Sequence, residues 1–140
     1  MAAFNKFDSF VEALAEKVHN LGSDTLKVML TNTAPVATNT IKANLTEIAA
    51  GNGYTAGGNT ASVTSSAQTS GTYKLVLGDP ATYTASGGSI GPFRYAVLYN
   101  DTATNDELIG WWDYGSSITL ADGESFAVDF DPTTGVLTIA

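Results

Sequence analysis

Apolar residues recur with a helical period at the start of the chain and with a strand-like period over the rest of it. The first stripe has spacings of 3, 4, 3, 4 and 3 and consists of Phe4, Phe7, Val11, Leu14, Val18 and Leu21. Such spacing places apolar side chains on one side of an α-helix. Gly22 follows the stripe, and glycine is common just after a helix end. The pattern therefore predicts an amphipathic helix over residues 1–22.

From residue 24 onward, short apolar runs separated by turn residues predict β-strands. We expect strands at 25–31, 59–68, 72–78, two within 81–101, and further ones at 106–115, 116–120, 124–130 and 135–140. A short helical turn is expected within 41–49, after a polar loop that contains Pro35. Many short strands with turns between them are typical of a sandwich or barrel. The prediction is a mainly β domain over residues 24–140, an antiparallel β-sandwich of the jelly-roll or immunoglobulin-like kind.

The predicted helix raises the question of what covers its apolar side. An isolated helix of roughly five turns is marginal in water, so the stripe must pack on its own domain or on a partner. We take the stripe as a candidate subunit contact, because each such side chain contributes roughly 1.5–3 kcal/mol when fully buried. Some eight or nine strands suffice to close a core, so residues 25–140 are expected to fold without the helix.

Composition restricts the partners. The chain has 140 residues, a formal net charge of −8, and only six Lys and Arg residues, which are scattered. A nucleic-acid partner is not expected, since such partners need a basic stripe. No apolar run reaches the ~18 residues of a membrane span, and the start of the chain does not resemble a signal peptide, so we expect synthesis in the cytoplasm and no membrane partner. The chain has no cysteine, which excludes disulfides and thiolate chemistry.

The segment GNGYTAGGNT, residues 51–60, superficially resembles a phosphate-binding loop. A dinucleotide or phosphate site needs its glycines at the mouth of a helix, and the following ASVTSSAQTSG does not favour one. The pattern instead predicts tight turns around Tyr54, in which positive φ is adopted by Gly51, Gly53, Gly57 and Gly58.

Few residues suggest catalysis. The single histidine, His19, is expected on the surface of the predicted helix, away from any nucleophile. Acids beside tryptophans suggest a sugar site, and the set consists of Asp106, Glu107, Trp111, Trp112 and Asp113. Aromatic residues in β proteins more often fill cores, however. We therefore expect no enzymatic activity.

Four acids near the end of the chain are possible calcium ligands: Asp122, Glu124, Asp129 and Asp131. Asp129 and Asp131 are two residues apart, so they would share one face of a strand. The spacing of an EF-hand loop is not met by residues 101–107, and solvated acidic turns are the simpler interpretation. No metal or other cofactor is expected.

Several stretches resemble a known family. They are AAFNKFDSFVEALAEKVHNL (2–21), NLTEIAAGNGYTAGG (44–58), PFRYAVLYND (92–101), LIGWWDYGSSITLADGESFAVDF (108–130) and GVLTIA (135–140). In this order they resemble small virion structural proteins of tailed bacteriophages, variously described as head-decoration, tail or fibre proteins. The resemblance extends over nearly everything from residue 24 onward and includes no catalytic signature.

The resemblance implies a β-sandwich assembled on a phage particle in many copies. The expected protein is a capsid decoration or cement subunit on the outside of the head, with the major capsid protein or other virion proteins as partners. It also implies a homo-oligomer, since a decoration protein must match the symmetry of its lattice. A tail or fibre component is the alternative within this class. A carbohydrate-binding module that uses Trp111 and Trp112 is the alternative from another class.

Overall fold

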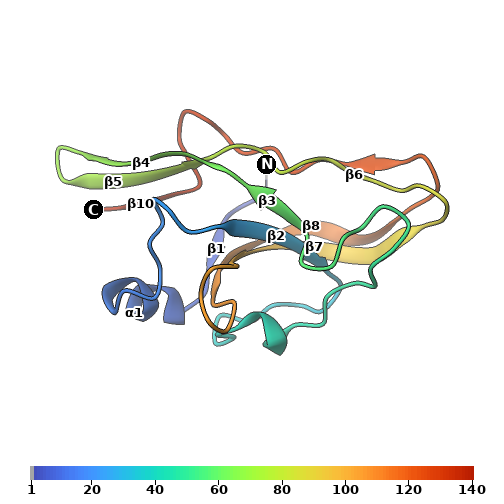
Figure 1. The fold of residues 1–140 in the computed structure, drawn as a ribbon, viewed down its shortest axis with the longest axis horizontal. Helices are drawn as coiled ribbons and strands as arrows, with labels where there is room; N and C mark the ends of the chain where they lie inside the picture. The colour runs from blue at the N-terminus through green and yellow to red at the C-terminus, as the bar shows by residue number, and fades with distance from the viewer. Residues whose placement is uncertain (1) are drawn as a thin grey trace.

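The computed structural model describes residues 2–140 and is mainly β, with antiparallel strand pairing (Figure 1). The elements are β1 (Asn5–Lys6), α1 (Ser9–Ala15), β2 (Leu26–Thr31), the 3-10 turn η1 (Lys42–Asn44), β3 (Asn59–Ala61), β4 (Val63–Thr69), β5 (Thr72–Leu77), β6 (Tyr83–Thr84), β7 (Ile90–Asn100), β8 (Leu108–Leu120), β9 (Ser125–Phe126) and β10 (Leu137–Ile139). This confirms the predicted antiparallel, sandwich-like class with one short helix near the N-terminus. No helix within residues 2–140 is both long enough and apolar enough to cross a bilayer.

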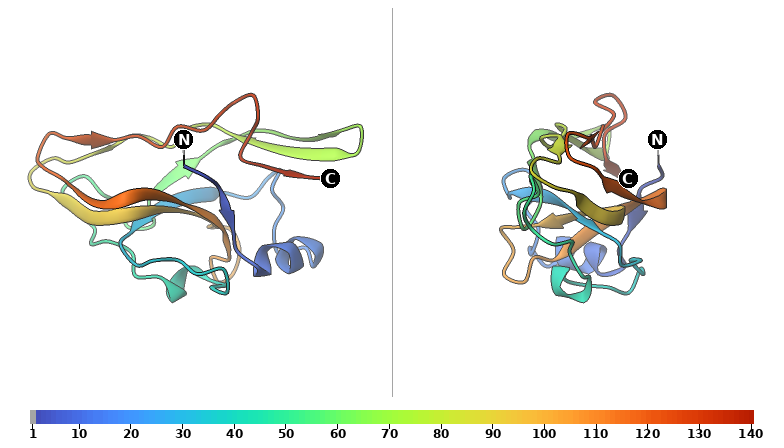
Figure 2. Two further views of the ribbon diagram at one scale, coloured as in Figure 1. Left: turned by 180° about the vertical axis from the view of Figure 1, so that it is seen from behind. Right: turned by 90° about the vertical axis from the view of Figure 1, so that its right-hand side faces the viewer.

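The strands of residues 2–140 form two layers. One layer is a five-stranded sheet in the order β1-β8-β7-β2-β3. The other combines the three-stranded sheet β10-β5-β4 with the pair β6-β9, and it lies above the five-stranded sheet in Figure 1. The segment around η1 lies on the opposite side of the five-stranded sheet, whereas α1 lies at one end of this sheet, where its Phe10 packs into the larger core (Figures 1 and 2).

Both faces of the five-stranded sheet are covered by apolar side chains. The face toward the second layer forms the larger core, which includes Leu26, Val28, Leu30 and Leu98. The opposite face forms a smaller core of Phe7, Met29, Leu45, Val97, Tyr99 and Leu108, with Trp111 packed against it. Three consecutive residues of β2, Val28, Met29 and Leu30, are therefore all fully buried.

The predicted glycine turns are confirmed. Positive φ is found at all four positions, Gly51, Gly53, Gly57 and Gly58. A Cβ at Gly58 would overlap the carbonyl oxygen of Val28, so this loop lies directly on β2. Within the loop, the buried Tyr54 hydroxyl accepts a hydrogen bond from Leu30 N (3.1 Å) and donates one to Glu47 Oε1 (2.7 Å). The glycines thus allow a close approach of backbone to backbone.

The predicted helix over residues 1–22 is wrong in its extent. Asn5 and Lys6 form an edge strand on β8, and the helix covers only Ser9–Ala15. It ends because Lys17 adopts φ 67°, with Val18 N bonded to Ala13 O at 2.8 Å. This is the six-to-one bond of a Schellman motif, here without the usual glycine. Gly22 therefore does not end the helix.

The six stripe residues do not share one face of a helix. Phe7 lies in the smaller core and Leu21 in the larger one. Phe4 and Leu14 are partly buried, whereas Val11 and Val18 are 55% and 36% exposed. The N-terminal segment thus packs into both cores, and the contact of the stripe with another subunit stays a prediction.

The strand predictions hold from 25 to 101, except that the one strand expected over 59–68 is two strands, β3 and β4, which belong to different sheets. They differ again after residue 101. The two strands expected over 106–120 are a single strand, β8, and the strand expected over 124–130 is reduced to β9. The backbone after β9 crosses the second layer without joining a ladder in the described chain until Leu137. This segment forms one wall of the groove described next.

Candidate functional site: apolar grooves between the layers

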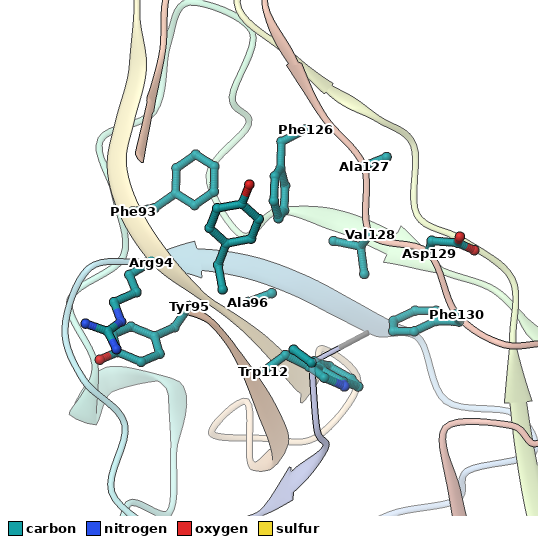
Figure 3. Close-up of a pocket in the computed structure, with 12 residues that line it drawn as sticks. Phe93, Arg94, Tyr95, Ala96, Trp112, Phe126, Ala127, Val128, Asp129 and Phe130 are labelled. Atoms are coloured by element: carbon teal, nitrogen blue, oxygen red, sulfur yellow. The ribbon is translucent and has the colours of Figure 1, made fainter. Parts of the chain in front are cut away.

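A groove of about 340 Å³ opens between the two layers, with β7 and β8 on one side and residues 126–130 on the other. We call it the aromatic groove. In Figure 3, Phe126 and Val128 lie across the groove from Phe93, and Arg94 and Tyr95 of β7 also contribute to its lining. The groove is therefore lined mainly by carbon atoms.

Ring contacts hold the wall of the aromatic groove in place. The ring centroid of Phe126 lies 5.0 Å from that of Phe93, and the centroid of Phe130 lies 5.3 Å from that of Trp112. Phe130 N also donates to Asp79 Oδ1 at 2.7 Å. Edge-on and tilted ring pairs of this kind contribute roughly 0.5–1.5 kcal/mol beyond their buried area. Contacts of side chains thus hold residues 127–130 in place, although these residues form no backbone hydrogen bonds of a β-ladder.

A second groove of about 710 Å³ lies between α1, β1 and β10. We call it the α1–β10 groove, and its walls are Phe4, Lys6, Phe10, Val11, Leu14, Ala15, Val136, Leu137, Thr138 and Ile139. Val11 and Ile139 expose 55% and 39% of their surface there. The Phe4 ring, 5.4 Å from the Trp112 ring, lies near both grooves.

An ion pair lies at the rim of the aromatic groove. Arg94 donates from Nε and Nη2 to the two carboxylate oxygens of Asp113, at 2.8 and 3.0 Å. Asp113 Oδ1 also accepts from Gly115 N at 2.8 Å. The hydrogen bonds from Arg94, and then that from Gly115, hold the pKa of Asp113 below its ordinary value. Asp113 is therefore an ionised, engaged carboxylate and is poorly suited to donate a proton.

The two tryptophans of the predicted sugar site point in opposite directions. Trp111 packs on Phe7 in the smaller core, with ring centroids 4.5 Å apart, whereas Trp112 packs on Phe4 and Phe130 beside the larger core. Adjacent residues of a strand alternate between its faces, which explains this arrangement. The pair therefore cannot form one stacking surface for a sugar.

Asp113 is also far from Glu107, an acid of the same set. Glu107 directly precedes β8 and Asp113 lies six residues further along, which in an extended strand is about 20 Å. Paired glycosidase carboxylates are roughly 5–9.5 Å apart. Burial, followed by the charge of Asp101, raises the pKa of Asp106. The geometry does not bring Asp113 to Glu107 as a catalytic pair.

Two of the acids considered as calcium ligands accept hydrogen bonds from backbone N–H groups in different turns. Asp131 Oδ1 accepts from Thr133 N at 2.7 Å, and Asp122 Oδ1 accepts from Gly87 N at 3.0 Å. The bonds from the backbone of the 131–134 turn, Thr133 first, lower the pKa of Asp131. Within residues 2–140, no three acidic, histidine or cysteine side chains gather as a metal ion would require.

His19 is not on the surface, and this prediction is wrong. Only 4% of the residue is exposed, because the chain turns inward after the helix ends at Ala15. Its ring lies 5.5 Å from that of Phe10, and its Nδ1 lies 2.9 Å from Nδ2 of Asn100. Sequence reasoning missed this site because Asn100 is 81 residues away and carries no signal of its own.

The two grooves can bury apolar surface of another molecule. Exposed apolar patches on soluble proteins commonly mark interaction sites. Comparisons of the chain with protein-family models, with curated proteins and with solved structures find no match in any of the three.

Proposed function

We propose that this chain is a non-enzymatic structural protein of a phage virion, bound as a decoration or cement subunit to the outside of the head. The whole-chain sequence resemblance supports this function. A small antiparallel sandwich suits a protein that binds a larger body in many copies. The expected partners are the major capsid protein and further copies of this chain.

One observation supports attachment through the α1–β10 groove. Among residues 2–140, the large hydrophobic side chains left exposed are Val11, Val18, Val36, Tyr114 and Ile139. Val11 and Ile139 line this groove, and Val18 lies three residues after the end of α1. Burial of apolar surface contributes roughly 25 cal/mol per Å², so covering this end would favour binding. We propose that the exposed part of the original stripe, Val11 with Leu14 and Phe4, contacts the neighbouring subunit.

Purified particles examined by cryo-electron microscopy test the location. Density for this chain over the head lattice is expected. Density only along the tail or at its tip would overturn the decoration role and favour a tail or fibre component. Native mass spectrometry of the isolated protein tests the homo-oligomer, and a strict monomer that also fails to bind capsids would contradict the proposal.

Val11→Asp is expected to weaken binding to capsids lacking the protein by at least about tenfold, because a carboxylate would have to be desolvated in the contact. The fold should tolerate the change, since Val11 is 55% exposed in the first turns of α1, where an acid is favourable. Co-sedimentation with capsids measures the effect.

The matched control is Val36→Asp, since Val36 is 53% exposed and lies outside both grooves. It should bind like the unmodified protein. Equal binding by both variants would exclude the α1–β10 groove as the attachment surface while leaving the virion role open.

A further inference from the structure

Asn100 is a fully buried side chain at the end of β7, and its orientation is fixed by backbone donors. Its Oδ1 accepts hydrogen bonds from Thr102 N at 2.9 Å and from Ala103 N at 3.2 Å. A backbone N–H can only donate, so the oxygen of the Asn100 amide must face this turn. The amide nitrogen must therefore face the other way.

The Asn100 nitrogen is a donor to two groups. It lies 2.7 Å from Asp24 Oδ2 and 2.9 Å from His19 Nδ1. His19 Nδ1 must accept this bond, so the neutral ring carries its proton on Nε2, an assignment inferred from the network. A protonated imidazole carries N–H on both nitrogens, and its new N–H would point at the N–H of Asn100. The site thus accommodates the neutral ring specifically.

This network joins the N-terminal segment to the end of β7. The His19 ring packs on Phe10 of α1, and Asp24 Oδ2 accepts a further bond from Asn20 N at 2.8 Å. Asn100 links these residues to the five-stranded sheet through its side chain, beside the backbone bond from Asp101 N to Thr25 O at 2.9 Å. Loss of the bond from Asn100 to His19 would leave the segment with fewer polar ties to the sheet.

We propose that His19 is an acid-sensitive latch: protonation of its Nδ1 breaks the hydrogen bond from Asn100 and loosens residues 16–24 from the end of β7.

Burial and the nearby carboxylates act on the pKa of His19 in opposite directions. Burial lowers the pKa of His19 below its ordinary value of 6.5, while the carboxylates of Glu107 and Asp24 act in the raising direction and are outweighed. Lys17 and Tyr73 are the other titratable groups that line the adjoining hollow. Asp24 is already engaged by Asn100 and Asn20, which limits its capacity to pair with a charged ring.

The direction of the pH effect follows from this lowered pKa. Below pH 6.5 a released His19 binds a proton more readily than the buried one, so the latched form loses stability as the pH falls. A single proton allows up to about a tenfold change in the opening equilibrium per pH unit. The change levels off once the pH is below the pKa of the buried ring. Depressed carboxylate pKa values, as at Asp113, act in a separate window below about pH 4.

Loosening of residues 16–24 would also affect the α1–β10 groove, because this segment directly follows α1, whose Phe10, Val11 and Leu14 line the groove. Acid-dependent detachment from a partner is thus a consequence, and it alone rests on the proposed function. The latch itself is a property of the isolated protein.

NMR of the isolated protein tests the latch, since the ring signals of its single histidine can be followed during a pH titration without overlap from another histidine. We expect a midpoint below 6.5. Over the same range, protection of the amides of Val18, Asn20 and Asp24 against hydrogen exchange should fall by up to about tenfold per pH unit, after correction for intrinsic rates. A midpoint at or above 6.5, or protection that does not follow the titration, would overturn the proposal.

Two variants separate the latch from general acid sensitivity. His19→Gln keeps an acceptor for Asn100 but does not titrate, so protection in residues 16–24 should no longer change between pH 6.5 and 5. The same loss in His19→Gln as in the unmodified protein would refute the latch. Asn100→Asp replaces the donor by an acceptor and should raise the midpoint of His19; an unchanged midpoint in the folded variant counts against the proposal. If Asn100→Asp does not fold, the His19→Gln comparison decides.

Discussion

Gly58→Ala is expected to destabilise the protein by about 4 kcal/mol or more, enough to unfold a domain of ordinary stability. The Cβ would overlap the carbonyl group of Val28 and approach the Cα of Met29, and Gly58 has φ +77°. Both neighbours are backbone atoms of fully buried residues of β2, so neither can move aside as a flexible side chain would. Urea denaturation monitored by circular dichroism measures the loss.

Gly71→Ala is the matched control for the backbone conformation alone. Gly71 has φ +83°, and no atom of residues 2–140 lies within 4 Å of its Cβ position, apart from the adjoining residues. A left-handed alanine costs roughly 1–2 kcal/mol, and no overlap adds to it. Equal losses in the two variants would show that the close approach of the glycine loop to β2 is wrong.

Phe7→Ala is expected to lower the free energy of unfolding by about 3–5 kcal/mol. The Phe7 side chain is fully buried in the smaller core, and its ring centroid lies 4.5 Å from that of Trp111. Val11→Ala, a change at an exposed position of the same predicted stripe, should stay within about 0.5 kcal/mol. Similar losses at both positions would mean that the stripe does form one face, as its spacing suggests.

Deletion of residues 1–22 extends this prediction. The sequence pattern suggests that residues 25–140 fold by themselves, but burial of Phe7, Phe10 and Leu21 leads to the opposite expectation. The truncated chain should be unfolded or aggregated at 25 °C, as judged by circular dichroism and size-exclusion chromatography. A folded, cooperative truncated domain would restore the view of the N-terminal segment as a separate element.

Most strands could be predicted because their signals are local. Alternation marks β2 and β5, and the turn glycines Gly71 and Gly87 separate strands as expected. The class of the fold follows from the number and spacing of these runs. The glycine turns around Tyr54 were predictable for the same reason, since positive φ is a property of single residues.

The smaller core could not be predicted, because it combines distant segments. Leu45 comes from an irregular loop and Phe7 from the N-terminus, and each covers a face of β2 and β7 that alternation alone would assign to solvent. Met29 is the clearest example, since it is buried between two buried neighbours. Only tertiary contacts could show that both faces of this sheet are covered.

The end of the helix and the candidate site could not be predicted from the sequence, for related reasons. The stripe spacing from Phe4 to Leu21 fits a helix, yet backbone pairing of Asn5 with β8 and the left-handed Lys17 interrupt it. Neither has a sequence signal, since lysine is not a usual residue at that position. The grooves likewise depend on how residues 126–130 cross the second layer, which ladder patterns do not describe.

The pairing of β1 with β8 joins two segments that are synthesised at well-separated times. Asn5 lies 106 positions before Trp111, so at 5–20 residues per second the ribosome needs roughly 5–20 s to supply the partner strand. Throughout that time Phe7 has no finished core to enter. The nascent chain therefore carries an exposed apolar segment around Phe7 until β8 has been made, a period in which chaperone binding would protect it from neighbouring chains.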